Sequence, residues 1–182
     1  MSERWVVNNV KGFLERISGC SLKVGANGKP LGFIVFFYDL HCPGCALLDI
    51  DLMDYFINLN RRGYIDLYFA DYPVHRVELL HAKARVLFKR SIDEYFKALS
   101  TIYEGLVKGS LAKDIPGVAD SEAEGEVEKV RKCKELARSI NVVGTPTILL
   151  GRYDREVGVA VFGYDSPDNV MKLIEEVIFE VS

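Results

Sequence analysis

Hydrophobic residues follow two kinds of pattern along this chain, short continuous runs and helical stripes. Residues 33–38 form a continuous apolar, β-prone run, which is typical of a strand buried on both faces in a parallel sheet. Residues 48–59 carry an apolar stripe at helical spacing, which ends at Arg62-Gly63, and residues 65–72 return to strand character. This order predicts a β-α-β unit, whose crossover we expect to be right-handed.

The flanking segments predict further helices and a second group of strands. Residues 4–18 have helical spacing and predict a short amphipathic helix, and residues 21–24 predict a strand. Residues 75–140 are almost entirely helical in pattern, with capping boxes predicted at Ser91 with Glu94 and at Ser121 with Glu124. The remaining elements are strands at 147–150 and 157–162, a Ser166-Pro167 cap, and a closing helix with apolar positions from Val170 to Val181.

The predicted fold class is therefore α/β, with a β-α-β unit and a β-β-α unit around one central sheet. At 182 residues the chain has room for one domain with a sizeable core. Each half has too few strands to stand alone, so we interpret residues 1–182 as a single domain and residues of about 75–140 as a helical insertion within it.

Composition and charge exclude several classes of function. The chain has 23 Lys and Arg against 26 Asp and Glu, and this net charge of -3 argues against nucleic-acid binding. Residues 1–5 do not open a signal peptide, and the apolar run at residues 31–38 is too short to span a bilayer. We therefore expect a cytoplasmic protein without a membrane span. The absence of Gln, with only seven Asn, favours a heat-adapted source.

The sequence Cys42-Pro43-Gly44-Cys45 lies at the predicted junction between a strand and a helix. A thiol at a helix N-terminus meets unpaired amide groups and the helix dipole, which lower its pKa and raise the fraction of reactive thiolate. The second thiol lies one turn further along, near enough to close a disulfide or to resolve a mixed one. Pro43 fits the first helical position, where no amide hydrogen is needed.

The alternative interpretation of this motif is half of a zinc site. Structural zinc needs further Cys or His ligands at compatible spacing, and the other candidates in this chain are isolated from one another. A redox pair is therefore the favoured interpretation, without metal and without a cofactor.

A second motif, Gly144-Thr145-Pro146-Thr147, comes just before a predicted buried strand. Taken alone, it is an ordinary proline at the start of a strand, since only about 5–6% of bonds before proline are cis. In combination with C-x-x-C at the first turn of a β-α-β unit, it gives the layout of the thioredoxin fold.

The two motifs together resemble the DsbA-like branch of the thiol-disulfide oxidoreductases. The resemblance is carried by residues 37–45 (FYDLHCPGC) and 143–147 (VGTPT), and by the order of elements over residues 22–181. It implies that Cys42 is the exposed nucleophile and Cys45 the buried resolving thiol. It also implies a cis bond before Pro146, with Thr145 contacting the sulfurs and the Thr145-Pro146 backbone pairing with an extended substrate segment.

One position departs from this family pattern. Many relatives carry an acidic residue six positions before the first cysteine, where this chain has Phe36. Asp39 is near in sequence, and we expect it closer to the surface. The proton of Cys45 could pass to water or to Asp39, and the sequence leaves this choice open.

The remaining histidines and cysteines have weaker predicted roles. A cationic His41 would favour the Cys42 thiolate, and an exposed loop histidine without effect is an equal alternative. His75 and His81 are expected to have ordinary surface or core roles. Cys20 and Cys133 are interpreted as buried free thiols, with a structural disulfide between them as the alternative. The aromatic stripe of Tyr95, Phe96 and Tyr103 is expected to be core.

The function predicted from the sequence is thiol-disulfide exchange with protein or peptide substrates, reset by a redox partner. Cys42 and Cys45 are its candidate catalytic residues, Thr145 and Pro146 bind substrate, and Asp39, His41, Pro43 and Gly44 modulate the site. The direction of exchange is open. Because no cationic histidine lies between the cysteines, we expect a weaker oxidant than the strongest periplasmic relatives. The rival functions are a zinc-binding module and a redox-silent peptide-binding domain.

Overall fold

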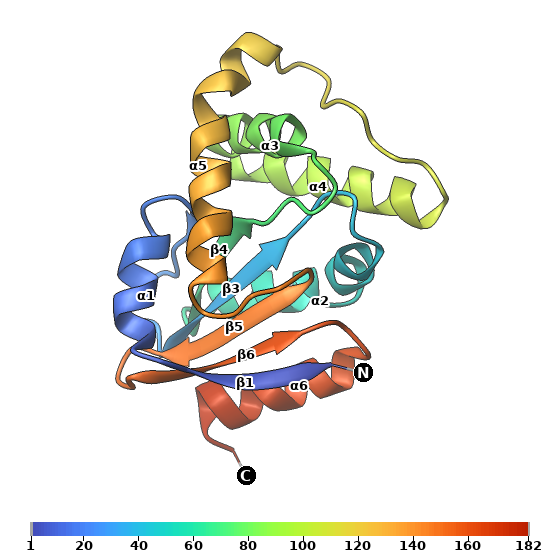
Figure 1. Cartoon of the computed structure of the whole chain (residues 1–182). Helices are drawn as coiled ribbons and strands as arrows, with labels where there is room; N and C mark the ends of the chain where they lie inside the picture. Colours follow the sequence, from blue (N-terminus) through green and yellow to red (C-terminus); the bar gives the residue numbers. More distant parts are fainter. Residues whose placement is uncertain (1, 182) are drawn as a thin grey trace.

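One mixed sheet of six strands organises the protein, with the predicted β-α-β unit at its centre (Figure 1). The structure is a computed structural model that describes residues 2–181. The strands lie in the order β1-β6-β5-β3-β4-β2. Their bounds are Glu3–Asn8 (β1), Leu22–Val24 (β2), Gly32–Tyr38 (β3), Ile65–Asp71 (β4), Thr147–Arg152 (β5) and Val157–Phe162 (β6). β3 and β4 are parallel, and the other pairings are antiparallel.

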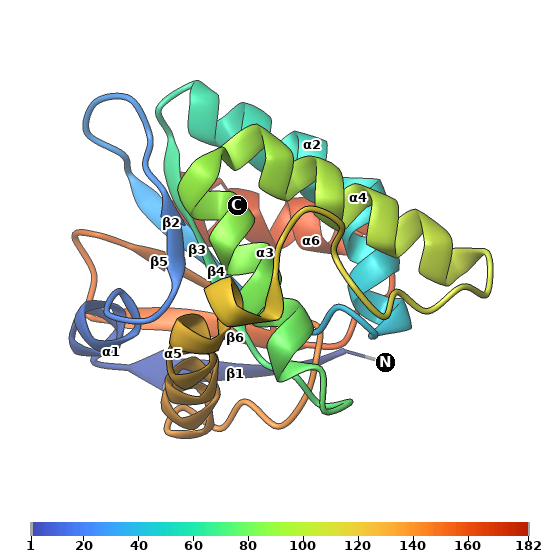
Figure 2. The same ribbon diagram turned by 90° about the horizontal axis from the view of Figure 1, so that it is seen from above.

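Helices cover both faces of this sheet. Figure 2 shows α1 and α5 on one side and α2, α4 and α6 on the other. The helices are α1 (Val10–Ile17), α2 (Pro43–Arg61), α3 (Glu78–Arg90), α4 (Ile92–Val107), α5 (Asp120–Arg138) and α6 (Pro167–Ile174), which continues into a π-helical turn, η1 (Glu175–Phe179). The thioredoxin-type α/β architecture predicted from the sequence is confirmed.

The apolar run in β3 divides between two cores because successive strand residues point to opposite faces. Ile34 and Phe36 belong to the core beneath α2, α4 and α6. Phe33, Val35 and Phe37 belong to the second core, beneath α1 and α5. Every residue of β3 is buried as a result, which explains why this strand is continuously hydrophobic.

The helix predicted over residues 4–18 is wrong in its first half. Residues 3–8 form β1, which pairs with β6 at the edge of the sheet, and helix α1 begins only at Val10. Asn9 separates the two elements with a left-handed backbone, and its side chain accepts a hydrogen bond from the Gly12 N–H. Trp5, Val6 and Val7 are β-prone, so pairing with β6 outweighs their accidental helical spacing.

The predicted insertion corresponds to α3, α4 and α5, which lie between β4 and β5. It is less helical than its pattern indicates, because residues 108–119 form a long loop between α4 and α5 (Figure 1). Gly109, just after the end of α4, has a positive φ angle, a conformation that ends a helix readily, and Gly117 has a positive φ angle later in the loop. Within residues 2–181, no helix combines the length and apolarity needed to cross a bilayer.

Two of the predicted caps are found and one is wrong. The hydroxyls of Ser91 and Ser166 accept amide hydrogen bonds at the starts of α4 and α6. Helix α5 begins earlier than predicted, and Glu122 accepts from the Ala119 N–H instead of a box at Ser121. The closing helix ends at Phe179, before the last apolar position of the predicted stripe.

Candidate active site

The C-x-x-C motif lies at the N-terminus of α2, directly after the central strand β3. Cys42 is the N-cap of this helix and Pro43 occupies its first turn, as predicted. The Cys45 N–H donates to the Cys42 sulfur over 3.3 Å. Both cysteines are free thiols. Cys42 therefore occupies the position where an unpaired helix amide favours a thiolate.

The two thiols have opposite acidities. A hydrogen bond from the Cys45 side chain, opposed by burial, lowers the pKa of Cys42 to about 6, with further contributions from the Thr145 side chain and the Cys45 N–H. Burial and the neighbouring Cys42 raise the pKa of Cys45 well above its ordinary value. The resemblance implies an exposed nucleophile, whereas Cys42 exposes only 6% of its surface, against 0% for Cys45. Cys42 thus ionises first, and Cys45 keeps its proton.

The loop before β5 brings a distant part of the chain onto Cys42. The Thr145–Pro146 peptide bond is cis, and the Cys42 thiol donates to the Thr145 carbonyl over 3.3 Å, across 103 positions of sequence. The Thr147 hydroxyl donates to the Gly144 carbonyl and fixes this loop. The Pro146 carbonyl accepts from the Gly163 N–H, so it is already engaged within the protein.

Gly44 allows this loop to approach the helix. A Cβ atom at position 44 would lie 2.8 Å from Cδ of Pro146 and 3.8 Å from the sulfur of Cys42. The first distance is shorter than any ordinary contact, so a side chain here would push the Pro146 loop away. The glycine between the cysteines is therefore required by the closeness of the two motifs.

Asp39 is fully buried, and the expectation that it lies near the surface is wrong. Its Oδ1 accepts from the His41 N–H at 3.0 Å. Its Oδ2 accepts from the N–H groups of Val74 and His75 at 2.9 and 3.2 Å, and from the His75 ring at 2.6 Å. The carboxylate thus ties the segment before Cys42 to the loop that follows β4.

This environment makes Asp39 a poor acceptor for the proton of Cys45. Burial opposes its ionisation, but the neighbouring His81 ring, 3.7 Å away, together with hydrogen bonds from the His41 N–H and His75, lowers the pKa of Asp39 below its usual range. Phe36, at the position where relatives carry an acid, is buried in the core. Neither position therefore supplies a carboxyl that readily takes up a proton at neutral pH.

The carboxyl of Asp49 differs from that of Asp39, because its pKa is raised instead of lowered. Asp49 lies on α2, one helical turn after Cys45, and is only 8% exposed. Burial, followed by the like charges of Asp54 and Glu104, raises its pKa to about 7. It lines a cavity of about 270 Å³ between α2 and α4. Sequence analysis did not single out Asp49, although its i+4 spacing from Cys45 was visible.

The three histidines are held by different parts of the protein. The His41 ring donates from Nε2 to the Ala112 carbonyl at 2.6 Å, which anchors the 108–119 loop beside the motif. His75 is half exposed and reaches Asp39. His81 is fully buried. Its Nε2 accepts from the Leu40 N–H at 3.1 Å, and its Nδ1 lies 2.8 Å from Oδ1 of Asp71.

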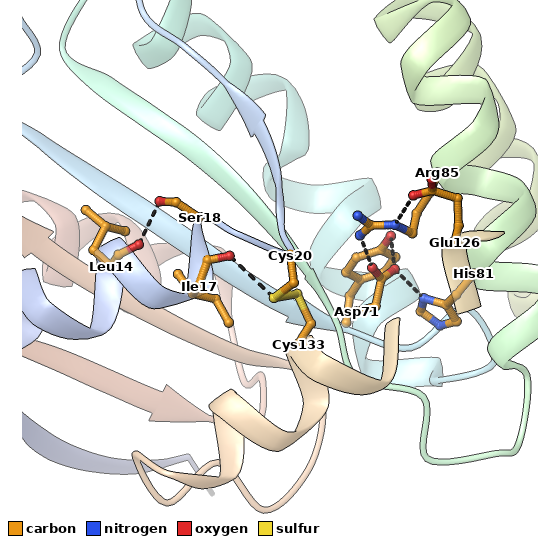
Figure 3. Close-up of a disulfide and its surroundings, with 10 residues drawn as sticks. Leu14, Ile17, Ser18, Cys20, Asp71, His81, Arg85, Glu126 and Cys133 are labelled. Carbon is orange, nitrogen blue, oxygen red and sulfur yellow. Dashed lines mark hydrogen bonds and ion pairs between the residues drawn. A yellow bond between two sulfur atoms is a disulfide. The ribbon is translucent and has the colours of Figure 1, made fainter. Parts of the chain in front are cut away.

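His81 belongs to a buried charge network that sequence analysis missed (Figure 3). Asp71 also accepts from Arg85 at 2.6 Å, and Arg85 donates onward to Glu126 of α5 at 3.0 Å. A signal was present in the sequence, because Asp39 and Asp71 follow or end neighbouring parallel strands, and His81 and Arg85 are four residues apart on one helix. The network links the segment before Cys42 to the helical insertion.

Cys20 and Cys133 form a disulfide, so the interpretation as free thiols is wrong and the alternative is correct (Figure 3). Their Cα atoms lie 5.5 Å apart, across 113 positions of sequence. Both are buried in the core beneath α1 and α5. This disulfide fixes α5 to the segment before β2 and lies apart from the Cys42 motif.

The aromatic stripe on α4 is core, as predicted. Tyr95 and Tyr103 are fully buried. The Tyr95 hydroxyl donates to that of Tyr38, and the Tyr103 hydroxyl donates to the Asp39 carbonyl at 3.3 Å. These side chains support the floor of the site. In residues 2–181, no three His, Cys, Asp or Glu side chains gather as metal ligands would.

Comparisons with known proteins agree with this geometry. The sequence model of the thioredoxin-like domain family matches residues 22–178. Among curated proteins, none matches. Three similar solved structures are Wolbachia pipientis alpha-DsbA1, a periplasmic thioredoxin-like protein from Salmonella enterica serovar Typhimurium, and the thiol-disulfide exchange protein alpha-DsbA2 from Wolbachia pipientis.

These likenesses extend over nearly the whole chain. For alpha-DsbA1 the identity is 14% and the TM-score 0.68, covering 88% of this chain and 92% of that one. For the Salmonella protein the identity is 19% and the TM-score 0.65, and the match covers 93% of this chain and 97% of that one. For alpha-DsbA2 the identity is 17% and the TM-score 0.62, and the match covers 92% of this chain and 93% of that one. The predicted resemblance to the DsbA-like branch is confirmed at the level of the fold.

The cytoplasmic location expected from the sequence is corrected by the same comparisons. The Salmonella structure, which this chain resembles in fold, is of a periplasmic protein, and this stands against the cytoplasmic expectation. The disulfide between Cys20 and Cys133 is of the kind that persists in oxidising compartments, which supplies a physical reason for the correction.

Proposed function

We propose that this chain, which belongs to the thioredoxin-like domain family, exchanges disulfides with protein or peptide substrates. The residues that would carry out the exchange are Cys42 and Cys45. The proposal treats residues 1–182 as one such domain carrying the helical insertion. The observation that carries it is the split in acidity between the two thiols, with the pKa of Cys42 at about 6 and that of Cys45 raised. Such a pair has a stable thiolate for attack and a protonated partner for resolution.

We assign the oxidising direction to this exchange. A stabilised Cys42 thiolate favours the reduced form of the pair, and therefore favours transfer of the disulfide to a substrate. Its pKa of about 6 lies between about 7 for thioredoxin and about 3.5 for DsbA. The protein is accordingly a weaker oxidant than DsbA.

The exchange has two balanced steps. A substrate thiolate attacks the sulfur of Cys42 in the Cys42–Cys45 disulfide, which forms a mixed disulfide and releases Cys45, which takes up a proton. A second substrate thiolate then attacks the first substrate sulfur and releases the Cys42 thiolate. The substrate loses two electrons and becomes a disulfide, and the cysteine pair gains both. A recycling partner that carries an oxidised disulfide restores the pair.

The residues around the sulfurs would orient the substrate. The Thr145 backbone lies against Cys42, and Val143, just before this loop, exposes 70% of its surface. We propose that an extended substrate segment pairs with the backbone at residues 143–145, since the Pro146 carbonyl is engaged by Gly163. Pro43 and Gly44 form the first turn of α2, and the missing side chain at Gly44 lets the Pro146 loop lie close to it. Asp39 and His41 hold the segment before Cys42 in place through their hydrogen bonds.

Trapping of a mixed disulfide tests this function. The oxidised protein is mixed with a reduced dithiol peptide, and each cysteine is read by mass spectrometry after alkylation. We expect stoichiometric reduction of the pair in the unsubstituted protein. Cys45→Ser has no internal disulfide, so it is mixed instead with the peptide in its disulfide form; the Cys42 thiolate attacks that disulfide, releases one peptide thiolate and accumulates as a peptide adduct. Cys42→Ser, treated in the same way, should give no adduct. An adduct on Cys45 in Cys42→Ser, or a pair that shows no redox transition in graded thiol buffers, would refute the proposal.

A further inference from the structure

The segment between β3 and α2 has an anchor at each of three consecutive amides. The Leu40 N–H donates to Nε2 of His81 at 3.1 Å. The His41 N–H donates to Oδ1 of Asp39 at 3.0 Å, and the Cys42 N–H donates to the Asp39 carbonyl at 3.1 Å. Buried amides are almost always paired in this way. Of these anchors, only His81 comes from outside the segment, and it is supplied by α3 of the insertion.

Its partners fix the tautomer of the His81 ring. Because Nε2 accepts from an amide, the ring proton is on Nδ1 and is donated to Oδ1 of Asp71 at 2.8 Å. Arg85 holds the other oxygen of Asp71 at 2.6 Å. The ring also packs on Tyr38, with centroids 5.0 Å apart. His81 is fully buried, so water does not compete for either nitrogen.

We propose that His81 is a positioning residue that tunes the reactivity of Cys42 through the Leu40 amide. This inference rests on the proposed function and deepens it. The hydrogen bond to Leu40 holds the chain two residues before Cys42, at the point where it turns from strand to helix. That position sets whether the Cys42 sulfur meets the Cys45 N–H at 3.3 Å and the Thr145 loop. Without the anchor, the stabilised thiolate loses part of its hydrogen bonding.

Two substitutions of His81 distinguish the hydrogen bond at Nε2 from the hydrogen bond at Nδ1. Asparagine at position 81 presents a polar atom near Nδ1 and keeps the contact with Asp71, but cannot reach Leu40. Glutamine presents a polar atom near Nε2 and keeps an acceptor for the Leu40 N–H. A purely structural role predicts that both variants lose stability and that neither changes the chemistry of Cys42.

The experiment measures the Cys42 pKa from the ultraviolet absorbance of the thiolate, together with the reduction potential of the pair. In His81→Asn we expect the pKa of Cys42 to rise by about one, since a hydrogen bond to a charged group contributes about 1.5 kcal/mol. The equilibrium constant for oxidation of a dithiol by the pair should fall about tenfold, which lowers the reduction potential by about 30 mV for a two-electron couple. His81→Gln should restore both values to those of the unsubstituted protein.

Equal values in His81→Asn, His81→Gln and the unsubstituted protein would overturn the inference, as would equal shifts in both variants. If His81→Asn does not fold, nitrogen NMR of the unsubstituted protein decides: we expect an unprotonated Nε2 at neutral pH, and a doubly protonated ring would overturn the assignment. Failure of the proposed function is distinguishable, because the unsubstituted protein would then show no redox transition.

Discussion

Replacement of Asp49 by asparagine should stabilise the folded protein in a manner that depends strongly on pH. Asp49 is a buried carboxyl on α2, and both Asp54 and Glu104 place like charges near it. In the unfolded chain it ionises with an ordinary pKa of 3.8, whereas in the folded protein burial and those charges raise the pKa to about 7. Asparagine has nearly the same shape and removes the charge.

The magnitude follows from the linkage between pKa and stability. Below pH 3.8 the carboxyl is protonated in both states and costs nothing. Between that pH and about 7 the folded state binds more protons than the unfolded state, so stability falls as the pH rises. A difference of one in pKa between the folded and unfolded states corresponds to about 1.4 kcal/mol. Ionisation of Asp49 therefore lowers the free energy of unfolding by at most about 4 kcal/mol above neutral pH. Asp49→Asn should remove most of this cost.

Urea unfolding followed by circular dichroism, at a series of pH values and in one defined redox state, measures the effect. The gain in the free energy of unfolding should be close to zero near pH 4, of the order of 2–4 kcal/mol near pH 8, and should rise between them. Asp54→Asn is the matched control on the same helix, and should give a smaller gain over the same pH range. A gain that is constant with pH, or a loss near pH 8, would refute the reasoning.

Three further substitutions test other parts of the structure. Gly44→Ala places a methyl group against the cis-proline loop and should cost about 1–3 kcal/mol in urea unfolding, with slower transfer of the disulfide to a dithiol peptide; an unaltered rate would contradict the close approach. Arg85→Met removes the guanidinium that bridges the buried carboxylates of Asp71 and Glu126, and should cost about 3 kcal/mol, since Asp71 keeps His81 and Glu126 keeps Lys89. Arg90→Met, at an exposed ion pair, should change little; equal effects would contradict the assigned burial. The double change Cys20→Ala with Cys133→Ala should cost about 2–4 kcal/mol while the redox transition of the C-x-x-C pair persists; loss of that transition would show that the two cysteine pairs are coupled.

The motifs could be predicted from sequence because each is defined by neighbours along the chain. Cys42, Pro43 and Cys45 lie within one helical turn, and their position after an apolar run identifies the junction of strand and helix. The β1 strand could not be predicted in the same way. Its identity depends on pairing with β6, far along the sequence, and its apolar residues happen to match a helical spacing as well.

The surroundings of Cys42 depend on contacts that local patterns do not encode. Asp39 and Asp71 lie at the same edge of the sheet because β3 and β4 are parallel, with Tyr38 opposite Asp71. His81 reaches them only through the packing of α3 over the ends of these strands. Sequence alone therefore located the two thiols at the start of a helix, but gave neither the hydrogen bonds that set their acidity nor the burial of Asp39.

The contact between Cys42 and the Thr145 loop also makes reactivity a product of completed folding. During synthesis, the segment with Cys42 and Cys45 emerges about a hundred residues before the loop that lies against it. Until that loop arrives, Cys42 lacks the contact with Thr145 that contributes to lowering its pKa. Under the proposed function, a chain that has not completed this contact would transfer disulfides poorly, so the reactivity of Cys42 is coupled to completion of the fold.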